Sequence, residues 1–394
     1  MEKKKSIFSY YKPYKKIFFA DMFFAIMASI ITLVIPLVVR YITSTVIYYE
    51  TDEAFRVILK LGLMMTVLIL FQCYCNYFIA NYGHVMGAKI EYDMRAEIFA
   101  HYQKLPFSFY DNQKVGQLLS RITSDLFDIT ELLHHGPENV VISAMKFIGA
   151  FVILFTISPK LTFAAFALIP FMFLYAWFFN RKMKKAFARN RVKIADINAQ
   201  IEDNLSGIRV VKSFANESVE EEKFKVGNDG FLAAKKDSYL YMGGYHSGLT
   251  AFINMITVIV LVAGGILITK AQVSVTDLVT FLLYISIMTD PVRTMIDFAE
   301  MFQNGYSGYE RFQEILAIEP DIQDSQGSEE LTDVKGTIDF ENVSFQYEEN
   351  TEKVLSHIDL HVDAGEYLAL VGSSGAGKTT LCNLCLLYTS PSPR

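Results

Sequence analysis

The chain has 394 residues, of which 52% are hydrophobic, with 36 basic and 42 acidic residues and a net charge of −6. So apolar a composition, beside so many charges, excludes an ordinary water-soluble protein and predicts membrane spans joined to soluble parts. The acidic balance also argues against a nucleic-acid-binding protein, because neutralising phosphates needs a basic face. The four cysteines, Cys73, Cys75, Cys382 and Cys385, are interpreted as small apolar fillers and not as zinc ligands.

Six apolar stretches follow a basic start. A hydrocarbon core about 30 Å thick needs about 20 apolar residues in helical form, because a helix satisfies its own backbone hydrogen bonds there. Residues 1–16 are basic like a signal peptide, but the apolar run after them is too long for one, so we expect a retained cytoplasmic N-terminal segment. The predicted spans are residues 17–39, 61–80, 139–157, 161–179, 247–269 and 275–302.

Lysine and arginine gather at one end of the predicted spans. Lysines precede the first span and basic residues follow the second and fourth, whereas the connection 41–55 has no lysine or arginine. Since basic residues near span ends remain in the cytoplasm, both termini and the two long connections are predicted to be cytoplasmic. The sequence therefore predicts a multi-pass protein of the cell membrane, with the lipid bilayer as a partner.

The two long cytoplasmic connections contain few glycines or prolines and are predicted to continue the helices. At about 1.5 Å per residue, about 25 helical residues reach roughly 35–40 Å beyond the membrane. We therefore expect residues 17–318 to form a mainly α transmembrane domain, a six-helix bundle with long cytoplasmic helical extensions.

A change of composition after residue 318 marks a boundary. Residues 319–335 are polar and acidic, which is typical of a linker. Beyond it, TIDFENVSFQY predicts an antiparallel strand with an irregularity, and HIDLHVD predicts a second strand with Ile358, Leu360 and Val362 on one face. His361 falls on the opposite face and is interpreted as a surface residue.

The segment EYLALVGSSGAGKTT has the order of a phosphate-binding loop: a predicted buried strand over 367–371, then Gly-x4-Gly-Lys-Thr, then a helix. Glycines let backbone N–H groups surround phosphate oxygens, and the helix N-terminus adds partial positive charge. Residues 336–384 are therefore predicted to be the N-terminal fragment of an α/β P-loop nucleotide-binding domain.

Two side chains of this loop have predicted roles towards ATP and Mg²⁺. Lys378 is expected to contact the β and γ phosphates, the one catalytic role assigned in the chain, and the Thr379 hydroxyl is expected to face the metal ion. Tyr347 ends the first predicted strand and is a candidate partner for adenine, although a tyrosine there is usually a packing or surface residue. The predicted ATP contacts of the loop are Gly372, Ser373, Ser374, Gly375, Ala376, Gly377, Lys378, Thr379 and Thr380.

Four segments carry a family likeness. LPFSFYDNQKVGQLLSRITSDL, LSGIRVVKSFANE, VSFQY and GSSGAGKTT, in a chain with six spans, resemble a half-transporter of the ABC exporter family, the lipid and multidrug type. The likeness covers residues 1 to about 384. It implies that residues 116–125 and 202–207 form two coupling helices that dock on nucleotide-binding domains. It also implies that Tyr347 stacks on adenine and that a second half-transporter completes a homo- or heterodimer.

The sequence departs from the family after the loop. It contains no glutamine loop, no LSGGQ signature, no acidic strand with a catalytic glutamate and no switch histidine. The chain as written is expected not to hydrolyse ATP, because no glutamate polarises the attacking water and no signature closes a partner's site. Residues 385–394 resemble the translation of a transposase-type sequencing adapter and are predicted to be a non-native tail.

Three functions stay open from the sequence: an ATP-driven exporter, a nucleotide-gated channel or sensor of the same architecture, and an inactive fragment. An amphipathic small molecule, a lipid or a peptide is the expected cargo, since the spans are rich in aromatic residues. The polar span residues His246, Asn254 and Asp290 are candidate cargo contacts, and hydrogen bonding between helices would explain them equally well.

Overall fold

The computed structural model describes residues 5–106, 109–110, 113–320, 332, 334–346 and 353–385 of the chain. The contacts between residues divide the chain into two compact units. One comprises Met1–Ile7, Lys89–Ile129 and Gly305–Arg394, and the other comprises Phe8–Ala88 and Thr130–Asn304. Most of the described residues are helical, so the mainly α fold class is confirmed.

Long helices contain all six predicted spans. Among the described residues, 6 helical segments are long and apolar enough to cross a membrane, and each contains one predicted span. Shorter elements join them or precede them: η1 (Ile7–Tyr14), η2 (Val46–Tyr48), η3 (Ile79–Gly83), α3 (His84–Tyr102), α5 (Val115–Ser120), η4 (Arg121–Asp125) and α9 (Ile208–Ser213). The helices that contain the spans are α1 (Lys15–Ser44), α2 (Thr51–Phe78), α6 (Leu126–Ile157), α7 (Pro159–Phe166) with α8 (Ile169–Ser206), α10 (Glu217–Thr269) and α11 (Val275–Leu316).

The fourth span is interrupted, whereas the sequence suggested one continuous helix. Helix α7 begins at a cap where the Ser158 hydroxyl accepts from the Leu161 N–H at 3.4 Å, and α8 starts afresh with Pro170 in its first turn. Proline has no N–H to donate and its ring clashes with the preceding turn, so the helix breaks just before it.

The unit formed by Phe8–Ala88 and Thr130–Asn304 is the larger of the two. Its core lies among α6, α7, α8, α10 and α11. Its largest buried side chains include Phe281 and Tyr284, and the Tyr284 hydroxyl donates to the carbonyl of Leu33 on α1. By contrast, α2 exposes many large apolar side chains, as a helix that faces lipid does. They include Phe55, Leu59, Leu63, Val67 and Leu70.

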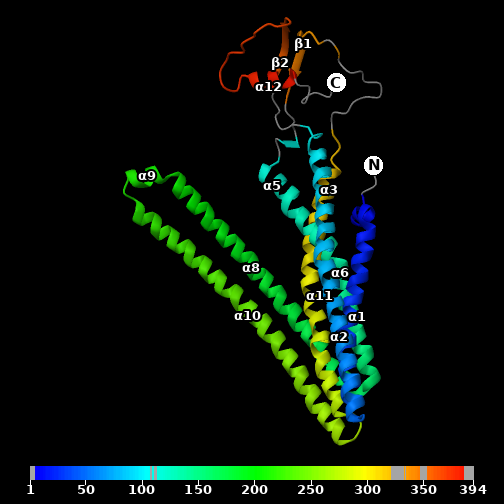
Figure 1. Cartoon of the computed structure of the whole chain (residues 1–394). Helices are drawn as coiled ribbons and strands as arrows, with labels where there is room; N and C mark the ends of the chain where they lie inside the picture. Colours follow the sequence, from blue (N-terminus) through cyan, green and yellow to red (C-terminus); the bar gives the residue numbers. More distant parts are fainter. Residues whose placement is uncertain are drawn as a thin grey trace. The chain divides into compact units, whose positions relative to one another are not determined.

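Helices α8 and α10 form a long hairpin that is closed by α9 (Figure 1). A glycine allows them to approach closely, because a Cβ at Gly248 would stand 2.1 Å from Cε1 of Tyr175. The Tyr175 hydroxyl donates to the Gly244 carbonyl at 2.8 Å across the same contact. Small residues and interhelical hydrogen bonds are the usual means of joining helices in membranes.

The P-loop fragment contains both antiparallel strands that the alternation predicts. Strand β1 (Ile338–Phe345) pairs with β2 (Leu355–Val362), and the register shifts on either side of Val343, which is the expected irregularity. Helix α12 (Lys378–Cys385) packs on the sheet. The small core consists of Phe340, Leu355, Leu381 and Leu384.

The predicted strand over 367–371 is wrong for this structure. These residues form no strand, and Tyr367 and Val371 are 101% and 90% exposed. A buried strand of a parallel sheet needs hydrogen-bonded neighbours on both sides. Among the described residues only β1 and β2 form a sheet, and they pair with each other.

Candidate functional site

The loop over 372–377 turns the chain into α12 through two glycines in the left-handed region. Gly375 has φ +84° and Gly377 has φ +81°, a conformation in which a Cβ would be strained. A Cβ on Gly377 would also stand 2.8 Å from Cδ2 of Leu355, whereas one on Gly375 would meet nothing within 4 Å. The loop is therefore held against β2 at one glycine and is open at the other.

Lys378 is the first residue of α12 and lies across the loop. Its ammonium group donates to the carbonyls of Gly372 at 3.0 Å and Ser373 at 2.7 Å. The helix begins as the Leu381 N–H bonds to the Gly377 carbonyl at 2.9 Å. The first N–H groups of such a helix have no partner within it and are free to bind an anion.

These residues fit the phosphates of a nucleotide. The structure brings the predicted contacts 372–380 together in one loop and helix start, with Thr379 exposed and Thr380 buried. A glycine turn, a lysine ammonium and an exposed hydroxyl are the donor set that a triphosphate and its Mg²⁺ need. Tyr347, the predicted adenine partner, lies outside the described residues.

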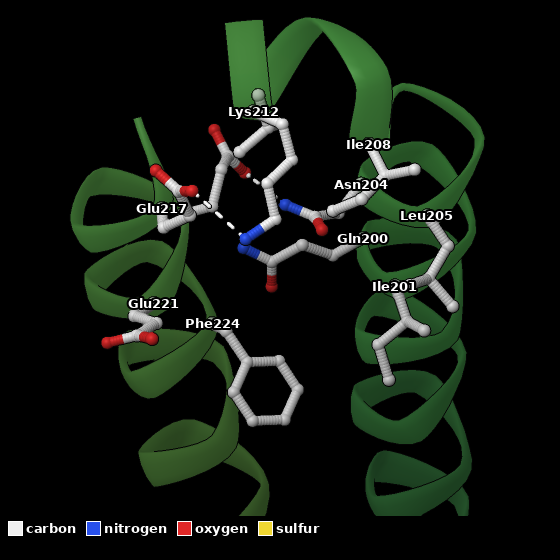
Figure 2. Close-up of a pocket in the computed structure, with 11 residues that line it drawn as sticks. Gln200, Ile201, Asn204, Leu205, Ile208, Lys212, Glu217, Glu221 and Phe224 are labelled. Atoms are coloured by element: carbon white, nitrogen blue, oxygen red, sulfur yellow. Dashed lines mark hydrogen bonds and ion pairs between the residues drawn. The ribbon is translucent and has the colours of Figure 1, made fainter. Parts of the chain in front are cut away.

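A pocket of about 310 Å³ lies at the tip of the α8–α10 hairpin. Figure 2 shows Lys212 and Glu217 pointing toward one another over it, and their Nζ and Oε1 atoms are 3.0 Å apart. Asn204 donates to Glu220 at 3.1 Å, which ties α8 to α10. The remaining lining residues are Gln200, Ile201, Leu205, Ile208, Val211, Glu221 and Phe224.

The second predicted coupling segment, 202–207, does not form a helix of its own. Residues 202–206 continue α8, and the separate short helix at the tip is α9, Ile208–Ser213, which begins after Gly207. The first predicted coupling segment, 116–125, is helical and comprises α5 and the π-helical turn η4.

Asp125, the last residue of η4, is paired with an arginine far along the chain. Its carboxylate accepts from Arg311 Nε at 2.7 Å and from Nη2 at 2.6 Å, and Asp125 is 7% exposed. Gly308 permits the contact, because a Cβ there would stand 3.0 Å from the Asp125 carbonyl oxygen. The pair joins the first predicted coupling segment to the end of α11. Sequence reasoning missed it, since 186 residues separate the partners and no local pattern connects them.

Two protein-family descriptions match the chain, one over the spans and one over the P-loop fragment. The ABC transporter transmembrane region matches residues 18–292, and the ABC transporter domain matches residues 355–393. The chain belongs to the ABC transporter family. With its six apolar helical segments, it is a multi-pass membrane protein with a partial ATP-binding domain.

Curated relatives extend the comparison. The chain is 38% identical over 380 residues to the "Uncharacterized ABC transporter ATP-binding protein YwjA" of Bacillus subtilis, covering 96% of this chain and 65% of that protein. It is 27% identical over 387 residues to the "Putative multidrug export ATP-binding/permease protein YgaD" of the same organism, covering 96% and 66%. It is 28% identical over 384 residues to the "Putative multidrug export ATP-binding/permease protein SAOUHSC_02003" of Staphylococcus aureus, covering 96% of this chain and 66% of that protein. The chain therefore spans just under two thirds of these relatives' length.

The polar span residues proposed for cargo are not gathered into one site. His246, Asn254 and Asp290 are all exposed on this single chain. No contact found among the described residues joins two of them. Their side chains therefore face lipid, solvent or another subunit and do not line an enclosed cavity of the chain.

Proposed function

We propose that this chain is part of one half of a dimeric, ATP-driven exporter of the cell membrane, with its N-terminus and nucleotide-binding domain in the cytoplasm. The observation that carries the proposal is the glycine loop and helix start at 372–380 in a chain that also carries six apolar spans. Membership of the ABC transporter family supports the same conclusion.

The loop has a definite task in this proposal. Backbone N–H groups of residues 372–377 and the first turn of α12 hold the phosphates, and Lys378 contacts the β and γ phosphates. Thr379, whose side chain is exposed, faces Mg²⁺. The bound Mg²⁺ would supply charge neutralisation to the phosphates. Hydrolysis is a property that we propose for the complete transporter.

The hairpin tips connect nucleotide binding to the spans. We assign docking on nucleotide-binding domains to α9, with its pocket of apolar and charged residues, and to α5 with η4. The Asp125–Arg311 pair fixes η4 to the end of α11, the helix that leads toward the ATP-binding fragment. A movement of η4 would therefore be transmitted to the end of α11.

The cargo that we propose is amphipathic or lipid-like. Two relatives carry printed names that refer to multidrug export. The aromatic content of 14%, most of it in or beside the spans, suits a molecule that partitions into the membrane interface.

The proposal is tested by nucleotide binding. The chain is placed in lipid nanodiscs and titrated with a fluorescent ATP analogue in the presence of Mg²⁺, with unlabelled ATP as competitor. We expect saturable binding that Lys378→Ala weakens at least about tenfold, the loss of one charge-assisted phosphate contact. Lys193→Ala, an exposed lysine on α8, is the matched control and should bind as the parent does.

Either of two results would refute the assigned site. One is an absence of Mg-ATP binding in folded nanodisc samples. The other is equal affinity in the parent chain and Lys378→Ala.

A further inference from the structure

Five ionisable side chains from three segments meet inside the larger unit. Asp21 comes from α1, His84 is the first residue of α3, and His134, His135 and Glu138 lie on one face of α6. Ligand atoms of Asp21, His134 and Glu138 all lie within 4.8 Å of one another. Those of His84, His134 and His135 form a second set with the same limit.

The centre of this cluster is buried and short of partners. Asp21 is 0% exposed and His134 is 3% exposed, and the Glu138 side chain is 12% exposed. Among the described residues, no group forms a hydrogen bond with either carboxylate oxygen of Asp21, with Nδ1 of His134 or with Oε2 of Glu138, whose contacts with His135 Nδ1 and His134 Nε2 are longer, at 3.5 Å and 3.9 Å. Buried polar atoms are nearly always paired, so four such atoms in one cluster require an explanation.

A metal cation satisfies all four atoms at once. A carboxylate that is buried without a partner is costly, and two of them close together also repel each other. A divalent cation between them cancels both charges and takes up the free lone pairs. Metal ligands about 2.1 Å from an ion lie roughly 3.4 Å apart in a tetrahedral site, so ligand atoms that lie within 4.8 Å of one another must move closer together to hold the ion.

We propose that Asp21, His134 and Glu138 bind a divalent transition-metal ion of the Zn²⁺ type. Imidazole nitrogen together with carboxylate oxygen is a donor set that such ions accept, and hard ions such as Mg²⁺ bind mainly to oxygen. His135 is placed to be a fourth ligand, with its Nδ1 3.5 Å from Oε2 of Glu138.

The neighbours of the three ligands are arranged as a metal site requires. His134 Nε2 lies 3.1 Å from His84 Nδ1 and 3.9 Å from Oε2 of Glu138, and Nδ1 of His134 has no hydrogen-bond partner among the described residues, so the contact with His84 orients the ring. Such outer hydrogen bonds orient ligating histidines. Gly83, the last residue of the π-helical turn η3, leaves the necessary room, since its Cβ would stand 2.4 Å from Cε1 of His134. π-Helical turns are frequent at functional sites.

The ion would join α1, α6 and the start of α3 at one point. These segments belong to or directly follow the first three spans in the chain, so the metal acts as a clamp on that part of the bundle. Binding to the folded chain alone raises its stability by mass action, which makes the clamp measurable without any transport assay.

Metal binding is tested on the chain in nanodiscs, purified without a polyhistidine tag and stripped with a chelator. Zn²⁺ is titrated in competition with a chromophoric chelator, and Co²⁺ is used as a spectroscopic probe of the same ligands. We expect one tight Zn²⁺ ion per chain, a rise in the thermal unfolding midpoint, and Co²⁺ absorption bands in the visible range. Asp21→Asn, His134→Gln and Glu138→Gln should each weaken Zn²⁺ binding at least about tenfold.

His361→Gln is the matched control, because His361 also lies beside two carboxylates, those of Asp339 and Asp363, but on an exposed surface. It should leave the tight Zn²⁺ site unchanged. If Asp21→Asn fails to fold, the Zn²⁺ affinity of Glu138→Gln tests the proposal instead, since glutamine keeps the shape of the glutamate side chain and loses only its charge. An absence of tight binding in the stripped parent chain, or equal affinities in the parent chain and the three ligand variants, would overturn the proposal.

Discussion

Two buried aspartates of this chain have opposite surroundings. Asp125 receives two hydrogen bonds from Arg311, at 2.7 Å and 2.6 Å, whereas Asp21 has no hydrogen-bond partner among the described residues. Both are almost fully buried. A buried charge is tolerated when it is paired, so the Asp125 carboxylate is satisfied within the fold, whereas the Asp21 carboxyl group is the one to which we assign a metal ion.

The contrast separates two reasons for a buried carboxylate. The Asp125–Arg311 pair holds two segments of the same unit together, and its loss should weaken the fold under all conditions. For the cluster around Asp21 we propose a metal ion as the partner. The effect of a substitution there should therefore depend on what is added to the buffer.

The largest effect is expected for Asp125→Ala. The change leaves the Arg311 guanidinium without its carboxylate, and removing one member of a buried pair costs about 3 kcal/mol where the other is partly exposed to water. The free energy of unfolding, measured by denaturant titration in detergent, should fall by that amount with and without Zn²⁺. Asp196→Ala breaks an exposed pair with Lys193 on α8 and should change stability by less than about 0.5 kcal/mol. Equal losses in the two variants would contradict the assignment.

The next largest effect is expected for Asp21→Asn, whose change in unfolding free energy should have opposite signs with and without Zn²⁺. In the presence of a chelator and at a pH where Asp21 is ionised, Asp21→Asn replaces a buried, unpartnered carboxylate with a neutral amide and should raise the free energy of unfolding by about 2 kcal/mol. With saturating Zn²⁺ the same variant should be less stable than the parent chain, because it has lost a ligand. Unfolding titrations of both proteins under both conditions measure the four values. A variant that is less stable under both conditions would show that Asp21 has a partner within the fold.

The sequence predicted the parts of this structure that depend on local composition. Apolar length located all six spans, and alternation located β1 and β2 with their irregularity. Strand 367–371 failed because a parallel strand depends on neighbours, which no local pattern supplies. The break before Pro170 was visible in the sequence as a proline inside a span, and its effect was overlooked.

The loop over 372–380 and the cluster around Asp21 also differ in how far the sequence could predict them. Residues 372–380 are contiguous, so their spacing alone predicted the loop and helix start that the structure shows, to which we assign the nucleotide. Asp21, His84, His134 and Glu138 come from three separate segments, and only folding brings them together. A charged residue within an apolar span was the one available signal, and it identifies Asp21 but none of its neighbours.

A smaller effect is expected for Gly83→Ala, which tests how tightly the cluster is packed. The new Cβ would stand 2.4 Å from Cε1 of His134 and 2.9 Å from Oδ1 of Asp21, so the His134 ring must move. We expect a loss of about 1 kcal/mol in unfolding free energy from overpacking, together with weaker Zn²⁺ binding. Gly62→Ala on α2 is the control, because a Cβ there meets nothing within 4 Å and should be tolerated. If Gly83→Ala behaves like Gly62→Ala in both measurements, the cluster is looser than its distances indicate.

The smallest effect concerns the exposed counterpart of the buried cluster. His361 lies opposite Asp339 in the β1–β2 register, and the hydrogen bond to Asp339, with a second contact to Asp363 at 3.2 Å, raises the pKa of its imidazole. Because the folded pKa is raised, the pair stabilises the strands fully below the ordinary histidine pKa of about 6.5, and this contribution is lost as pH rises through the folded pKa. An NMR titration of histidine-labelled protein, with His361→Gln to assign the signal, should give a midpoint above 6.5 that Asp339→Asn lowers. A midpoint that Asp339→Asn leaves unchanged would mean that the carboxylate does not hold the proton on His361. His361 and the cluster around Asp21 would then differ only in burial, since water can replace a missing partner at the exposed histidine and cannot do so in the buried cluster.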